Sequence, residues 1–135
     1  MDYKTKLEEL LLTTARQGAS DLHIAVSRKP TLRIDGALVP LEKELILTPE
    51  MAEGLVTALL TAEQKEYLTK AREYDFSYAF QDKARFRVNT YYQRGYLSAA
   101  MRLIPAQIRT VEQLNLPPIF HDFAKATQGF VLVVG

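Results

Sequence analysis

The sequence predicts an α+β domain in which helices pack against an antiparallel sheet. Three observations support this fold class. Apolar residues recur at helical spacing in early segments, strict alternation replaces that spacing after residue 71, and short glycine-containing turns separate the alternating runs. The chain has 135 residues, of which 47% are hydrophobic, and this is enough to build one packed core.

The first two predicted elements are a helix and a strand. Apolar positions on one helical face lie at Leu7, Leu10, Leu11 and Thr14, and Gly18 follows where a left-handed C-terminal cap belongs. Residues 21–26 then alternate, which predicts a half-buried strand with its even-numbered side chains toward the core.

A hairpin is predicted next. Residues 31–34 and 37–39 flank Asp35-Gly36, a pair that suits a type I′ turn because both central residues need positive φ. That two-residue turn pairs Ile34 with Ala37 and Leu32 with Val39.

Two further helices are predicted from their start signals. Thr48-Pro49 provides an N-cap followed by proline in the first turn. Thr61 and Gln64 match a capping box, which predicts a second helix ending near Ala71.

The alternating region predicts a three-stranded antiparallel meander over residues 74–80, 84–92 and 96–103. Its turns are Gln81-Asp82 and Arg94-Gly95. One face of the first strand is aromatic, which predicts core packing. The middle strand carries Arg85 and Arg87 on the face opposite its apolar residues.

The composition changes after residue 104 and predicts a linker. Residues 110–114 and 119–124 are short helical candidates within it. Residues 130–134 are apolar at every position, which is typical of a strand buried on both faces of a parallel sheet. We therefore expect a second domain to begin there and to be cut off after Gly135.

Composition excludes several function classes. The net charge is +1, from 17 basic and 16 acidic residues, so no bulk field favours nucleic acid or an anionic membrane. The chain has no cysteine and two histidines, which argues against a protein-built metal site. The N-terminus lacks an apolar signal segment, and no run approaches the ~20 apolar residues of a membrane span, so we expect a cytoplasmic protein without direct membrane insertion.

The candidate functional residues are four arginines: Arg85, Arg87, Arg94 and Arg102. Guanidinium groups on a rigid sheet can bind phosphate oxygens in a fork geometry, which suits a nucleotide at a domain or subunit boundary. The simpler interpretation is an exposed strand face paired with Asp75.

Two other constellations have simpler interpretations. Asp21 and His23 share a strand face without a nucleophile, so a half-buried histidine bonded to its surroundings is the better interpretation. Tyr91 and Tyr92 beside the arginines suggest single-stranded nucleic-acid binding, but alternation sends Tyr92 toward the core.

Six segments together resemble the PilT-like motor ATPases of the type IV pilus and, more distantly, the wider type II/type IV secretion ATPase family. In chain order they read QGASDLHI at 17–24, LRIDG at 32–36, EYDFSY at 73–78, ARFRVN at 84–89, MRLIP at 101–105 and GFVLVVG at 129–135. The match runs from near residue 7 to the last residue. The turn at residues 93–95 is one residue shorter than the form common in the family.

The resemblance implies a domain organisation and a function. It implies a PAS-like N-terminal domain at 1–103, an interdomain linker with short helices at 104–128, and the first strand of a RecA-like ATPase domain at 129–135. Gly135 would be the first glycine of the Walker A loop, so the chain would not be an enzyme by itself. Its role would be regulation and oligomerisation in a hexameric motor that retracts pili in twitching motility.

The resemblance also implies ligands and partners. ATP and Mg²⁺ would be bound by the full-length protein and no cofactor by this chain, and Arg85, Arg87, Arg94 and Arg102 would contact or sense the nucleotide. The partners would be further copies of the protein and the pilus platform protein of the inner membrane, with no nucleic acid. The location would be cytoplasmic and peripheral to the inner membrane. A stand-alone PAS-like ligand-binding module is the alternative function.

Overall fold

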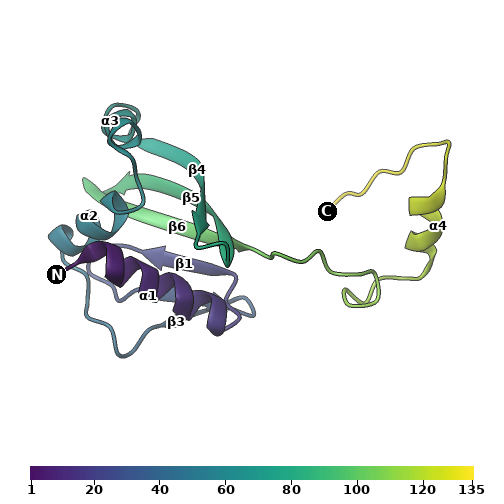
Figure 1. Ribbon diagram of the computed structural model, residues 1–135, viewed down its shortest axis with the longest axis horizontal. Helices are drawn as coiled ribbons and strands as arrows, with labels where there is room; N and C mark the ends of the chain where they lie inside the picture. Colours follow the sequence, from purple (N-terminus) through teal and green to yellow (C-terminus); the bar gives the residue numbers. More distant parts are fainter.

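The computed structural model describes residues 1–135 and contains one six-stranded sheet (Figure 1). The strand order is β3-β2-β1-β6-β5-β4, and all neighbours are antiparallel. The strands are β1 (Asp21–Ile24), β2 (Thr31–Ile34), β3 (Ala37–Pro40), β4 (Glu73–Phe80), β5 (Ala84–Gln93) and β6 (Tyr96–Ile104). The α+β class with an antiparallel sheet and packed helices is therefore confirmed.

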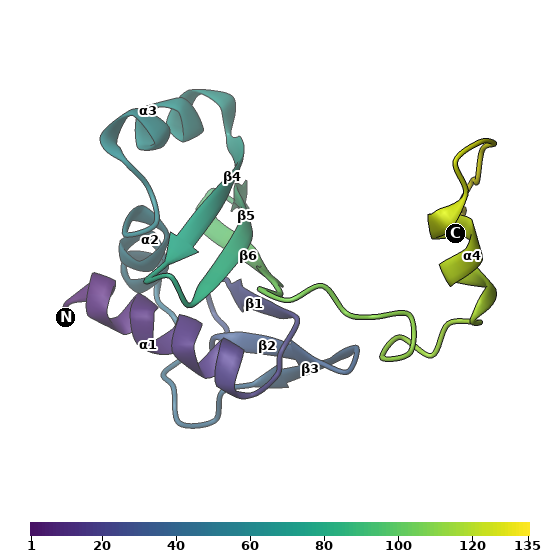
Figure 2. The same cartoon turned by 45° about the vertical axis from the view of Figure 1, so that its right-hand side comes forward.

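Three helices form the second layer (Figure 2). α1 (Tyr3–Arg16) and α2 (Pro49–Thr57) cover one face of the sheet by packing on β1 and β6, and α3 (Ala62–Ala71) packs at the β4 end. The other face of the sheet carries no helix (Figure 2). Each helix begins at a side-chain cap, from Asp2, Thr48 and Thr61 respectively, and the Thr61–Gln64 capping box is complete.

Local turn chemistry sets the predicted registers. Asp35 and Gly36 have φ of 49° and 81°, and Ile34 pairs with Ala37 across this turn as expected. Arg94 and Gly95 have φ of 53° and 83°, which makes a second two-residue turn and pairs Gln93 with Tyr96. The three-stranded meander is confirmed along its whole length.

One core of 19 buried apolar residues lies between the sheet and the helices, and all of its members fall between Leu7 and Met101. α1 contributes the three predicted leucines at the positions where helical spacing placed them. The even-numbered residues Phe86 and Val88 of β5 are fully buried, which turns the odd-numbered residues to the uncovered face.

One strand boundary was predicted wrongly. β1 ends at Ile24 and not at residue 26, because the chain turns at Ser27, whose φ is 65° and whose amide bonds the Leu47 carbonyl instead of a strand. Residues 130–134 are exposed and form no strand here, where no neighbouring strand lies beside them to supply ladder hydrogen bonds. That they are the first strand of a second domain stays a prediction.

Residues 105–135 leave the domain as an extended segment (Figure 1). The candidate helix at 110–114 is a single capped turn, in which the Thr110 and Gln113 side chains bond each other's backbone amides. The second candidate is α4 (Ile119–Lys125), which buries no residue.

Candidate functional site

A row of charged side chains crosses the uncovered face of the sheet. Strand register places Arg33 of β2 opposite Asp21 of β1, Asp21 opposite Arg102 of β6, and Arg102 opposite Arg87 of β5. We call Arg85, Arg87 and Arg102 the arginine row; Arg85 lies two positions before Arg87, on the same face of β5. Three of the four arginines singled out from the sequence are thus neighbours.

Asp21 anchors this row. Its carboxylate accepts a hydrogen bond from the Arg102 Nε at 3.2 Å, lies 3.9 Å from the Arg33 Nε, and accepts the Ser20 hydroxyl at 2.6 Å. Burial works against ionisation of Asp21, but the Ser20 and Arg102 hydrogen bonds outweigh it, so the pKa of Asp21 falls below its ordinary value. Arg102 is therefore paired with Asp21 through its Nε, while 73% of its side chain stays exposed.

Arg85 and Arg87 are exposed and have no ion-pair or hydrogen-bond partner for their side chains. The prediction that Asp75 pairs with them is wrong. Asp75 lies opposite Asn89 and accepts the Asn89 amide at 2.7 Å, while Arg87 faces Ser77. Two guanidinium groups are consequently free to bind an anion.

Arg94 is separated from the arginine row. It sits in the turn between β5 and β6, at the far end of β5, about 20 Å along the strand from Arg87 at ~3.3 Å per residue. One phosphate group cannot contact both. Arg94 instead lines a hollow of about 590 Å³ on the uncovered face.

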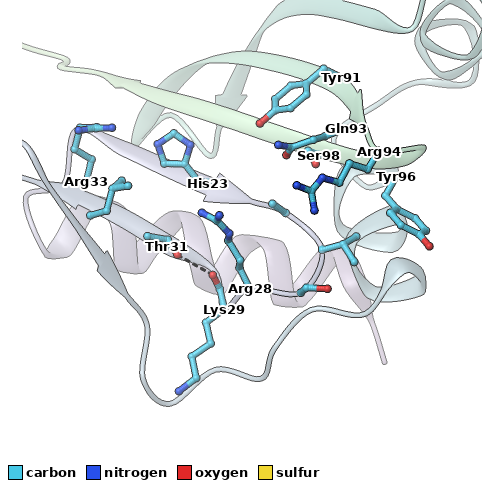
Figure 3. Close-up of a pocket in the computed structure, with 14 residues that line it drawn as sticks. His23, Arg28, Lys29, Thr31, Arg33, Tyr91, Gln93, Arg94, Tyr96 and Ser98 are labelled. Carbon is cyan, nitrogen blue, oxygen red and sulfur yellow. Dashed lines mark hydrogen bonds between the residues drawn. The ribbon is translucent and has the colours of Figure 1, made fainter.

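The hollow lies between the loop after β1 and the β5–β6 turn (Figure 3). Arg28 rises from that loop toward His23, Arg94 enters from the turn, and the Lys29 side chain points away (Figure 3). Tyr91, Tyr96 and Ser98 are among the other lining residues, and no aspartate or glutamate lines it.

His23 differs from its expected role. Its side chain makes no hydrogen bond, and its Nε2 atom is covered without a partner, so the prediction of a histidine bonded to its surroundings is wrong. Burial lowers the pKa of His23, Asp21 opposes this effect, and Arg33 adds to it. His23 is therefore neutral near pH 7.

Sequence reasoning missed Arg28. It lies in an irregular loop with no periodicity, and only the tertiary fold brings it to the side of the sheet where Arg94 lies. No group of three His, Cys, Asp or Glu side chains is arranged to hold a metal ion. None of the helices has the length and apolar character needed to cross a bilayer.

The sequence of this chain is similar to those of known pilus ATPases. No family model matches the chain. It is 34% identical over 134 residues to the type IV pilus retraction ATPase PilT of Pseudomonas aeruginosa, covering 96% of this chain and 37% of that protein. It is 31% identical over 130 residues to the type IV pilus ATPase PilU of the same organism, covering 96% of this chain and 34% of PilU.

A solved structure agrees with this result. The crystal structure of the pilus retraction motor PilT with bound ADP matches with a TM-score of 0.74 at 32% identity, covering 88% of this chain and 35% of that one. The chain thus spans about a third of the length of the relatives it matches. The chain is homologous to the PilT and PilU ATPases over 96% of its length, and its fold is that of the N-terminal domain of PilT-like ATPases.

Proposed function

We propose that this chain is the N-terminal regulatory and oligomerisation domain of a hexameric PilT-like ATPase that powers type IV pilus retraction. The observation that carries the proposal is the arginine row on the uncovered face of the sheet. Arg85 and Arg87 are exposed and unpaired, and a sheet face without a helix layer is available to a second domain or subunit.

In this proposal the arginine row approaches a nucleotide bound at a domain or subunit boundary. Guanidinium forks match phosphate oxygens, and Arg102 contacts Asp21 through its Nε, which leaves its two terminal nitrogens unpaired. Arg85 and Arg87 lie beside it on a rigid strand. Arg94 lies too far along β5 from Arg87 to contact the same phosphate group, so it makes a separate contact.

The proposed domain organisation is the one expected from the sequence: a PAS-like domain at 1–103, a linker at 104–128, and the start of a RecA-like domain at 129–135. Residues 104–107 act as the hinge for rigid-body movement on ATP binding. Residues 130–134 gain strand partners in the RecA-like domain, and Gly135 begins its phosphate-binding loop. Their exposed apolar side chains support this assignment, since they need a buried environment.

The chain itself is non-catalytic in this proposal. ATP and Mg²⁺ bind the motor domain of the full-length protein. That protein works in the cytoplasm, peripheral to the inner membrane, by contact with the platform protein of the pilus machinery.

The test is ATP turnover by the full-length protein with Arg85→Ala or Arg87→Ala. Losing a charge-assisted hydrogen bond of about 1.5–3 kcal/mol lowers turnover by roughly tenfold or more. Thermal unfolding of this domain stays unchanged, because both side chains are exposed and unpaired. Arg16→Ala is the matched control, because Arg16 is exposed at the end of α1, in the helix layer. Turnover equal to that of the unmodified protein in both arginine variants would contradict the proposal.

A further inference from the structure

The hollow beside Arg94 is not used by the arginine row and has its own chemistry. We propose that it binds a small phosphate-bearing organic molecule, held by Arg28 and Arg94 beside the Tyr91 ring. This site goes beyond the nucleotide contact proposed above, because the two places are separated along β5.

Charge is the first argument. The chain as a whole is nearly balanced, with 17 basic and 16 acidic residues, yet the hollow is lined by Arg28, Lys29, Arg33 and Arg94 without one carboxylate. A cavity lined by charges of one sign raises the local concentration of the opposite ion. The hollow therefore selects for negative charge independently of the net charge of the chain.

Only two of these four cationic side chains are unpaired and so available to a ligand. The Lys29 Nζ lies 2.7 Å from the Glu42 carboxylate, and Arg33 bonds the Gly36 carbonyl and lies near Asp21. Arg28 and Arg94 have no ion pair and no side-chain hydrogen bond. Two free guanidinium groups reaching one hollow from different loops suit a doubly charged phosphate.

The size and lining of the hollow indicate that the phosphate of the ligand is attached to an organic group. A volume of about 590 Å³ falls in the ordinary range of small-molecule sites and far exceeds that of a bare ion. Tyr91 provides a flat apolar surface, and Ser98 provides a hydroxyl group. This concave mixture favours a small molecule over an acidic protein segment, which needs a longer and flatter surface.

His23 provides a built-in reporter. It lines the same hollow, and its imidazole is neutral near pH 7 because burial and Arg33 disfavour the charged form. A bound dianion stabilises the imidazolium and raises the pKa of His23. Ligand binding at this place is therefore visible as a change in the titration of one ring.

The experiment is an NMR titration of the 135-residue chain with phenyl phosphate, and with phenol as its uncharged counterpart. We expect saturable binding of phenyl phosphate, a raised pKa of His23, and no binding of phenol. Arg28→Ala and Arg94→Asn each weaken binding about tenfold or more, the loss expected for a charge-assisted contact. Asparagine is chosen at position 94 because it tolerates the positive φ of the turn.

Arg16→Ala is the matched control, since it removes an exposed arginine of the helix layer, outside both the hollow and the arginine row. The affinity of this variant for phenyl phosphate should equal that of the unmodified chain. No saturable binding up to about 10 mM would overturn the proposal. So would equal binding of phenol, a loss in Arg87→Ala with none in Arg28→Ala, or tighter binding of a short glutamate peptide than of phenyl phosphate. None of these outcomes bears on ATP turnover by the full-length protein, so the two proposals fail separately.

Discussion

Apolar side chains are buried in one region of this chain and left unburied in another. Between residues 3 and 104, helices and strands enclose a core whose members Leu7, Phe86 and Met101 are fully buried. In residues 105–135 no apolar side chain is buried, and Ile108 is 97% and Phe130 86% exposed. The difference teaches that hydrophobic composition alone does not make a core, because burial needs partner elements whose apolar faces match.

The largest expected contrast is between two phenylalanines. Phe86→Ala removes a fully buried ring from β5 and should lower the free energy of unfolding by about 3–5 kcal/mol. Phe130→Ala removes an exposed ring and should change the free energy of unfolding by less than ~0.5 kcal/mol. Urea denaturation of both variants measures the contrast. Similar losses would mean that residues 105–135 pack on the domain in solution.

The two capping boxes provide a second, smaller contrast. Thr61→Ala removes the cap of α3 and should cost about 1 kcal/mol of unfolding free energy. Thr110→Ala removes the corresponding hydrogen bond, from the Gln113 amide to the threonine hydroxyl, in an isolated turn outside the core and should leave the main unfolding transition unchanged. Chemical denaturation followed by circular dichroism compares them, and an equal shift in both would show that the turn unfolds together with the domain.

The smallest expected contrast is in how the free energy of unfolding changes as the pH is lowered. The pKa of Asp21 is lowered in the folded state, so its contribution is present above the unfolded value of about 3.9 and is lost as pH falls below it. Asp21→Asn should therefore destabilise the domain at pH 7 and have progressively less effect as the solution is acidified.

Glu112→Gln is the control for this measurement. The His121 hydrogen bond lowers the pKa of Glu112 in the same direction, but both residues are outside the domain. The unfolding curve of the Glu112→Gln variant should match that of the unmodified chain at every pH. An Asp21→Asn variant whose loss of stability is the same at pH 7 and pH 3 would contradict the assignment to an ionised carboxylate.

The sequence by itself determined the local elements and much of their pairing. Helical spacing, the Thr48 and Thr61 caps and the glycine turns act between residues close in the chain, so their signals were readable without a fold. The alternation in β5 likewise put Arg85 and Arg87 on the face away from the core. These predictions held because each depends on periodicity or on contacts within a few residues.

Only the tertiary structure decided which arginines are neighbours. The antiparallel pairing of β5 with β6 sets Arg87 against Arg102 and sends Arg94 to the opposite end of the strand, while Arg28 approaches from a loop far away in sequence. It also decided that the apolar run at residues 130–134 forms no strand, since a strand exists only when a neighbour completes its hydrogen bonds. Long-range pairing leaves no local signal, and for that physical reason the sequence could name the candidate side chains but not assemble them into sites.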